Sequence, residues 1–468
     1  MSQPASQPTN NRELHRALGP VTAGAILAGT VIGTGIFLVP STMAREMGSI
    51  EGVFAVWLFG ALLSLCGAFA YAELGSSLPE PGGEYVFLRR AYGPLWGFLF
   101  GWQQIVIGRT GSIAAMGLAA SLFLGYFIGG LERDFLALGG FAVSGLQLSA
   151  IISILLLTFV NLFGVARGGA LQNLLTVVKI GAILALAALA FGSGKGSWQH
   201  FSVEMPDPSR ALTSHIGAFG AALAAALWAY DGWNNLTLVS GEIRDPHRTI
   251  PRVLVIGVLA VAVVYILTNL AYFYVLPFKE VQQSQRVAQD VATRLLGIIG
   301  GQALTLAAVI STLAALNGSI LSGARIFFAM SRDGLLFRGL SSVHPIHRTP
   351  VRALVFQCLF ATALILLLGH DKAAFERMLD YALFGTWGFY GLTSLAVIVL
   401  RYRHPDLPRP YLTVGYPWVP LIFSGVALLF CISIAARRPT ESLMGMLLLL
   451  AGLPFFVYWN CRQGPKTS

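Results

Sequence analysis

Two short stretches place residues that weaken a helix inside long apolar runs. The first, VIGTGIF at 31–37, has Gly33 and Gly35 on either side of Thr34, and each glycine costs about 1 kcal/mol relative to alanine in a helix interior. The second, LWAYDGWNNLTL at 227–238, carries an aspartate, a glycine and two asparagines. Interrupted helices expose backbone N–H and C=O groups, which are suited to binding the charged ends of a small ligand.

The charge that each break can bind depends on which half-helix end faces the ligand. N-terminal ends present N–H groups and suit a carboxylate, whereas C-terminal ends present carbonyls and suit an ammonium. We expect the N–H groups of Thr34, Gly35 and Ile36 to bind a carboxylate. The carbonyls near Ile32 and Trp228 would bind an ammonium group. A site with both poles fits a zwitterionic amino acid.

A simpler interpretation of the first stretch is a packing face between helices. Gly29 and Gly33 have the spacing of the small-xxx-small pattern, which lets two helices approach closely. Alternatively, Gly33 lets the backbone approach a ligand. Matching interruptions in two halves of a membrane protein point to a binding site at the midplane, and the presence of two breaks favours this second interpretation.

The composition indicates that lipid surrounds both stretches. The chain has 468 residues, of which 55% are hydrophobic and only 11% charged, against roughly 25% charged residues in ordinary soluble domains. About 20 apolar residues cross the hydrocarbon core as a helix. The runs are continuously apolar, whereas barrel strands alternate, so we expect an all-α integral membrane protein.

Twelve apolar runs are long enough to span a bilayer, and the interrupted ones are the first and the sixth. This spacing predicts a 5+5 inverted repeat followed by two further helices. The expected spans are 20–43, 52–74, 93–124, 144–164, 170–191, 213–238, 252–276, 300–330, 352–370, 380–401, 416–436 and 442–460. The transporter domain, 20–460, would comprise repeat one (20–191), repeat two (213–401) and helices 11 and 12 (416–460), between tails 1–19 and 461–468.

The distribution of basic residues predicts the orientation. Lys and Arg are more frequent in the loops that face inside when the N-terminus is inside, which favours both termini in the cytoplasm of a cell-membrane protein. The net charge of +10 reflects this asymmetry and an attraction to anionic lipid, so it requires no nucleic-acid partner.

Several motifs resemble the amino acid–polyamine–organocation superfamily and, within it, the L-type (light-chain) amino acid transporters. The similarity extends from about residue 15 to residue 460. It implies the leucine-transporter-type fold and the uptake or exchange of amino acids. The motifs are GTVIGTGIF (29–37), LPEPGGEYVFLRRAYG (78–93), LQNLLTVVKIGA (171–182), ALWAYDGWNNLTLVSGEIRDPHRTIPR (226–252), LTNLAYFYVL (267–276) and STLAALNGSILSGARIFFAMSRDG (311–334).

Lys179 lies in the middle of the fifth run, where a lysine costs roughly 2.5 to 3.5 kcal/mol on insertion scales. It should therefore face a polar interior, although snorkelling to the interface is a simpler alternative. The resemblance implies that its ammonium replaces the ion of sodium-coupled relatives and connects span one, near Gly33, to Ser311. It also implies that Tyr272 connects the lysine region to the substrate, with an aromatic core residue as the alternative. Transport would then be independent of sodium, whereas a buried lysine that loses its proton would allow proton coupling.

The interrupted sixth run supplies the remaining expected substrate contacts. The resemblance implies that Trp228 closes over the substrate from outside. Asp231 could bind a cation, but an aspartate before GWNN can also cap the second half-helix. Asn235 could reach the substrate or span the break, and Ala229 and Gly232 belong to the same stretch.

Two positions depart from the pattern of the resembling family. Arg109 is followed by Thr110 where the family often has proline, and we expect Arg109 to satisfy span carbonyls or an acid instead of contacting the ligand. The segment GGLERDFLALGG at 129–140 lacks the cysteine through which animal light chains bond a heavy chain. We therefore expect no disulfide-linked partner.

The titratable residues argue against an enzyme. The histidines fall in tails, loops and span edges, and the cysteines have no metal-ligand spacing, so we expect no catalytic set, no metal and no cofactor. With Asp231 assigned to capping, neutral L-amino acids would be preferred over lysine and arginine. The expected function is sodium-independent transport, with exchange as its mode. The alternatives are a proton-coupled symporter and a sensor that binds amino acids on the same fold without moving them.

Overall fold

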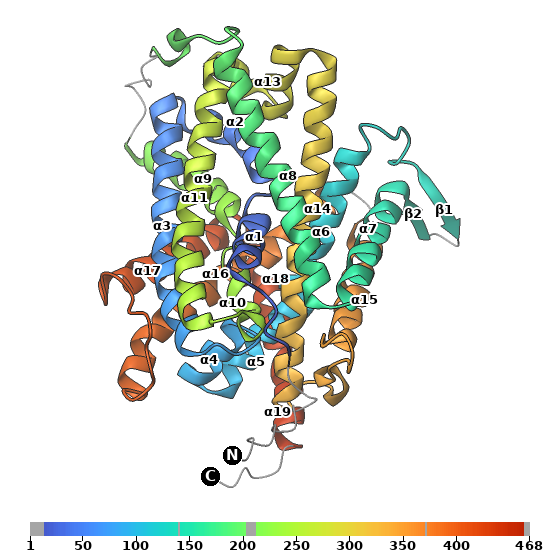
Figure 1. Cartoon of the computed structure of the whole chain (residues 1–468), viewed down its shortest axis with the longest axis vertical. Coiled ribbons are helices and arrows are strands. Elements are labelled where there is room, and N and C mark those ends of the chain that lie inside the picture. Colours follow the sequence, from blue (N-terminus) through green and yellow to red (C-terminus); the bar gives the residue numbers. More distant parts are fainter. Residues whose placement is uncertain (1–13, 139–140, 203–211, 370–371, 463–468) are drawn as a thin grey trace, which may run out of the picture.

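The computed structural model describes residues 14–138, 141–202, 212–369 and 372–462 (Figure 1). Most of the expected tails, 1–19 and 461–468, lies outside these ranges. The helices are α1 (Pro20–Val31), α2 (Gly35–Met47), α3 (Ile50–Ser77), α4 (Glu84–Tyr92), α5 (Pro94–Gln103), α6 (Arg109–Leu124), α7 (Gly145–Leu162), α8 (Val165–Gly192), α9 (Leu212–Tyr230), α10 (Asn235–Leu238), α11 (Pro246–Val275), α12 (Phe278–Gln283), α13 (Val287–Leu296), α14 (Ile298–Arg332), α15 (Val351–Leu368), α16 (Lys372–Arg403), α17 (Trp418–Arg437), α18 (Pro439–Leu450) and α19 (Gly452–Cys461).

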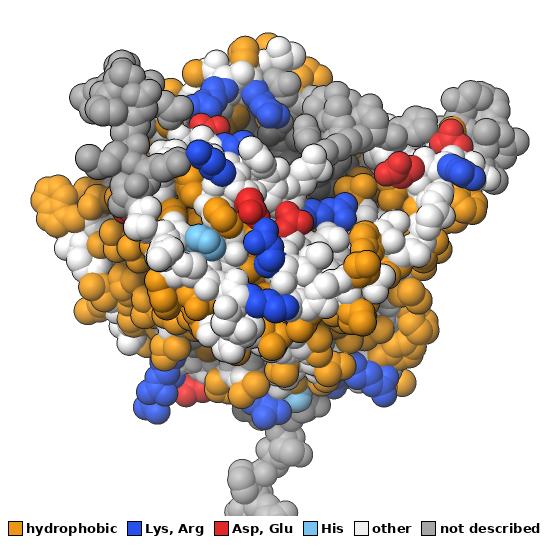
Figure 2. All heavy atoms as spheres, turned by 90° about the horizontal axis from the view of Figure 1, so that it is seen from above, with side chains coloured by type: hydrophobic (Ala, Val, Ile, Leu, Met, Phe, Trp, Pro, Cys, Tyr) orange, Lys and Arg blue, Asp and Glu red, His pale blue; other side chains and the backbone are white. Residues whose placement is uncertain are grey.

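The helices have the length and composition of a membrane protein. In the described part of the chain, nine are long and apolar enough to cross a bilayer, or ten if the bent pair α1–α2 counts as one span. Large apolar side chains on their outer faces are exposed, such as Val177 and Ile256. Figure 2 shows hydrophobic side chains crowding the flank, whereas charged side chains gather on the end face. The fold is therefore that of an all-α, multi-pass membrane protein.

Three features occur where the sequence predicted only loops or a single helix. Strands β1 (Asp134–Leu138) and β2 (Phe141–Ser144) form an antiparallel hairpin that projects from the helical body in Figure 1. Helix α4 fills the connection between α3 and α5. A π-helical turn, Gln104–Gly108, separates α5 from α6, and such turns are frequent at functional sites.

Both interrupted runs contain a break in the structure. Helix α1 ends at Val31 and α2 begins at Gly35, with a bend of 42° between their axes. Helix α9 ends at Tyr230, and the chain passes through a turn with Gly232 at φ 112° before α10 starts at Asn235. Only glycine adopts this φ without strain, which explains the glycine in the second break.

The two breaks lie against each other. Thr30 donates a hydrogen bond to the carbonyl of Gly232 at 2.9 Å, and α2 packs along α9. A Cβ on Gly35 would lie 2.8 Å from the Cα of Ala229, so glycine is required where these two helices meet. The sequence therefore brings its two weakest helical segments to one place in the fold.

Candidate functional site

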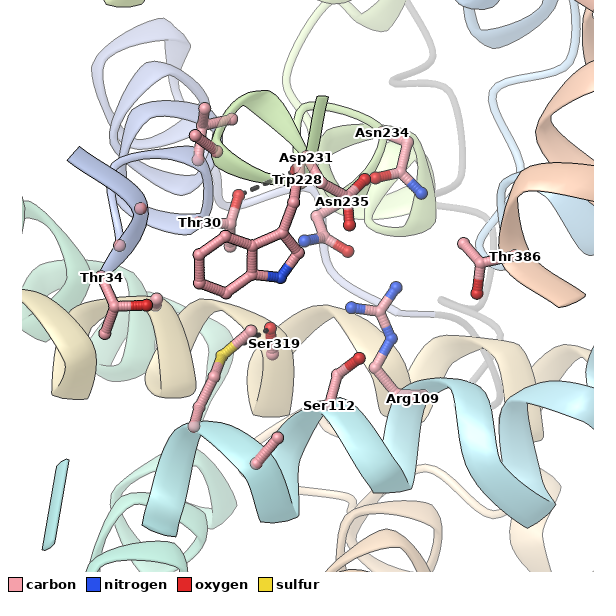
Figure 3. Close-up of a pocket in the computed structure, with 18 of the residues that line it drawn as sticks. Thr30, Thr34, Arg109, Ser112, Trp228, Asp231, Asn234, Asn235, Ser319 and Thr386 are labelled. Atoms are coloured by element: carbon pink, nitrogen blue, oxygen red, sulfur yellow. Dashed lines mark hydrogen bonds between the residues drawn. The ribbon is translucent and has the colours of Figure 1, made fainter. Parts of the chain in front are cut away.

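A cavity lies between the two breaks and is bounded on its other sides by α6, α14 and α16 (Figure 3). Most of the residues expected to contact a substrate line it: Gly33, Thr34, Gly35, Trp228, Ala229, Asp231, Gly232 and Asn235. The side chains of Ile32 and Ile36 are buried elsewhere and do not line it. Further residues line the cavity that were not expected to contact a substrate: Thr30, Gln104, Arg109, Ser112, Met116, Asn234, Thr312, Ser319, Thr386 and Tyr390.

The start of α2 presents N–H groups to the cavity. Thr34 precedes the first helical residue, and its side chain makes no capping hydrogen bond. Within the described chain, the N–H groups of Thr34, Gly35 and Ile36 have no hydrogen-bond acceptor outside their helix, while the next N–H, of Phe37, bonds to the Thr34 carbonyl. The first N–H groups of a helix have no partner inside it, so these groups are available to an anion.

The carbonyls of the first break are partly occupied by protein donors. The Ile32 carbonyl accepts hydrogen bonds from Lys179 and from the Ser311 hydroxyl, the latter at 3.2 Å. Both of its lone pairs are engaged, so the expectation that this carbonyl binds an ammonium group does not fit the structure. The carbonyls of Val31 and Ala229 lie 3.0 and 2.9 Å from the Tyr265 hydroxyl, and both residues line the cavity. Tyr265 thus joins the two breaks, a contact that sequence reasoning missed.

Lys179 is buried, with 1% of its surface exposed, and its ammonium also donates to the Gly29 carbonyl at 2.6 Å. It belongs to a polar face of α8 on which Gln172 and Thr176 both donate to the Ala25 carbonyl. The spacing of residues 172, 176 and 179 is that of one helix face. This pattern is visible in the sequence and could have identified the whole face.

The two glycines of the packing interpretation have different surroundings. A Cβ on Gly29 would lie 1.9 Å from the Gln172 amide nitrogen, so Gly29 serves the close approach of α1 and α8. A Cβ on Gly33 would meet only ordinary contacts, the nearest side-chain atom being the Ala315 Cβ at 3.9 Å. Packing therefore accounts for Gly29, whereas Gly33 lines the cavity.

Tyr272 lies near the site without lining it. Its buried hydroxyl is 3.4 Å from the Ile36 carbonyl, which links α11 to the first turn of α2. This contact helps to fix the position of α2, whose first N–H groups lie beside the cavity.

Asp231 does not cap the second half-helix. Helix α10 has Asn234 at its N-cap position and no side-chain capping bond, while Asp231 accepts a hydrogen bond from the Tyr390 hydroxyl at 2.9 Å. Asn234 donates to the buried carboxyl of Glu84 at the start of α4. Burial raises the pKa of the Glu84 carboxyl to about 7. The second break is therefore held by Tyr390 of α16, through Asp231, and by Glu84 of α4, through Asn234.

Fold and site together define a class of protein. Polar backbone at membrane depth is tolerated where it lines a cavity, and paired broken helices around such a cavity are typical of secondary transporters. Residues 18–453 match the model of the amino acid permease family. The chain belongs to this family of transporters, within the amino acid–polyamine–organocation superfamily.

Individual relatives agree with this assignment over nearly the whole chain. The serine/threonine exchanger SteT of Bacillus subtilis is 33% identical, covering 97% of this chain and 99% of its own. The b(0,+)-type amino acid transporter 1 of Mus musculus is 32% identical, covering 97% and 91%. The large neutral amino acids transporter small subunit 2 of Oryctolagus cuniculus is 31% identical, covering 96% and 81%.

Proposed function

We propose that this protein exchanges L-amino acids across the cell membrane by alternating access, without sodium and with a preference for neutral substrates. The observation that carries the proposal is one cavity lined by residues of both breaks, beside which the first N–H groups of α2 have no acceptor outside their helix within the described chain. The N–H groups suit the α-carboxylate, and the carbonyls suit the α-ammonium. The substrate contacts are those of the two breaks, with Trp228 closing over the bound molecule.

The proposed architecture has twelve spans, with repeats 20–191 and 213–401 and both termini in the cytoplasm. The positions of the two breaks, five spans apart, support an inverted repeat. Alternating access would then move one part of each repeat around the fixed cavity. The last two spans, 416–460, would lie outside the repeats.

Sodium independence rests on Lys179. Its ammonium occupies the Gly29 carbonyl and, together with the Ser311 hydroxyl, the Ile32 carbonyl, so neither carbonyl is open to a cation. Two unit charges about 4 Å apart repel by roughly 4 kcal/mol at an effective dielectric constant of 20, so a sodium ion beside this ammonium is disfavoured. The second candidate function, proton-coupled symport, rests on the same buried lysine. A non-transporting sensor is the third.

The small-subunit relative assembles, by its name, with another chain. The described part of the segment between α6 and α7 contains no cysteine, and the sequence has none at residues 125–144. We therefore propose that the protein works without a disulfide-linked partner.

Blocked substrate analogues test the two-pole site. In proteoliposomes, N-acetylserine and serine methyl ester should not inhibit serine exchange, because each lacks one of the two charges that the cavity binds. Unlabelled serine and alanine should compete well, and lysine poorly. Strong inhibition by either blocked analogue would contradict the two-pole assignment, and lysine competing as well as alanine would contradict the neutral preference.

A further inference from the structure

Arg109 places a guanidinium in the cavity. It is the first residue of α6 and is 8% exposed, yet it lines the same cavity as the two breaks. Figure 3 shows the guanidinium pointing away from α6, toward Asp231 and Asn235. Its Nε has no hydrogen-bond partner, and in the described part of the chain the expected bonds to carbonyls or to an acid are not formed.

Two acids lie near Arg109, and neither forms a hydrogen bond with it in the described part of the chain. Asp231 and Glu84 lie close enough to interact electrostatically with it, but the hydrogen bonds that they accept come from Tyr390 and Asn234, and Glu84 Oε2 has no partner. Leaving a buried charged donor without a partner costs more than the roughly 1–3 kcal/mol of a neutral group. A bound molecule with an oxygen at this position would remove that cost.

We propose that Arg109 is a specificity-determining residue, whose guanidinium donates a hydrogen bond to an oxygen on the substrate side chain. This inference rests on the proposed function and narrows its substrate class to neutral amino acids with a hydroxyl or amide oxygen. The guanidinium and the nearby carboxyl groups of Asp231 and Glu84 give this part of the cavity charges of both signs. A neutral side chain with an oxygen can accept from the guanidinium without bringing a further charge into the cavity.

Two hydroxyl groups on the same side of the cavity fit this class. Ser112 lies three residues after Arg109 on α6, and Thr386 faces the guanidinium from α16 (Figure 3). Thr386 accepts a hydrogen bond from Gln103 at 3.3 Å, which leaves its own hydroxyl proton for a ligand. Sites built to bond a substrate hydroxyl discriminate strongly against the isostere that lacks it, because the buried polar groups then remain unpaired.

Threonine and valine provide the test, since they have nearly the same shape and differ by one hydroxyl. In wild-type proteoliposomes, threonine should inhibit labelled serine exchange at a concentration at least about tenfold lower than valine does. Arg109→Met removes the donors while keeping a long side chain, and should bring the two inhibition constants within about twofold of each other. Arg109→Lys keeps the charge with a different donor geometry and should give an intermediate ratio.

The matched control is Arg133→Met, which removes an exposed arginine of the segment after α6 and should leave the ratio unchanged. If the inhibition constants of valine and threonine were nearly equal in the wild type, the inference would be overturned. An unchanged ratio of these constants in Arg109→Met would overturn it as well. If Arg109→Met does not fold, the ratio of the valine and threonine inhibition constants in the wild type and in Arg109→Lys still tests the inference. Failure of the proposed function is distinct, because the wild type would then exchange neither serine nor threonine.

Discussion

Replacing Lys179 by methionine should reduce serine exchange to about a tenth of the wild-type rate or less. The substitution keeps the length and apolar stem of the side chain but removes the donor to the Gly29 and Ile32 carbonyls. The Ile32 carbonyl keeps Ser311 as a donor, whereas the Gly29 carbonyl loses its side-chain donor. A buried acceptor left without a partner costs roughly 1–3 kcal/mol, and here the cost falls on the segment that must hold its shape around the ligand. Initial exchange rates in proteoliposomes, at matched protein content, measure the effect.

The control for Lys179→Met is Lys195→Met. Lys195 also donates to a backbone carbonyl, that of Leu295 at 2.8 Å, but this contact lies outside the spanning part of α8. Its replacement should leave exchange nearly unchanged. Size-exclusion profiles of both variants in detergent separate loss of function from loss of folding. Normal exchange by a folded Lys179→Met protein would show that the ammonium has no part in transport.

Alanine substitution at Gly33 should impair exchange and leave folding intact, whereas alanine at Gly35 should impair folding. Gly33→Ala meets no contact closer than 3.9 Å from a side chain, so the protein should fold with near-wild-type stability. Its new methyl group enters space at the cavity where the ligand backbone would lie. Exchange efficiency should therefore fall roughly tenfold or more, which corresponds to about 1.4 kcal/mol of binding free energy.

Gly35→Ala, by contrast, should fail chiefly through folding. Its Cβ would lie 2.8 Å from both the Cα and the Cβ of Ala229, and backbone atoms cannot move aside without separating α2 from α9. Folded yield and the melting temperature in detergent should both drop. If Gly33→Ala were unstable while Gly35→Ala folded normally, the described packing around the first break would be wrong.

The sequence predicted the parts of the site that depend on local backbone preference. Gly33, Gly35 and Gly232 weaken helices wherever they occur, so the positions of both breaks follow from residue types alone. Lys179 was recognisable because an ammonium in an apolar run needs a polar partner. Each of these signals is contained in a few neighbouring residues.

The remaining contacts depend on which helices meet, and this information is not local. The Ile32 carbonyl was expected to be free, but Lys179 and Ser311 reach it from two other helices. Asp231 was expected to act on its own segment, whereas Tyr390, more than 150 residues away, donates to it. Arg109 was expected to bond carbonyls or an acid, because the sequence does not show which groups face it from other helices, and in the structure it lines the cavity.

Counterflow in proteoliposomes distinguishes sodium-independent transport from binding alone. Vesicles loaded with unlabelled serine are diluted into a trace of labelled serine, once in sodium buffer and once in choline buffer of equal ionic strength. We expect transient accumulation of label above its equilibrium level, with the same time course in both buffers, because Lys179 occupies the carbonyls that sodium would need. Label that binds without accumulating would contradict transport, and accumulation only in sodium would contradict the role assigned to Lys179.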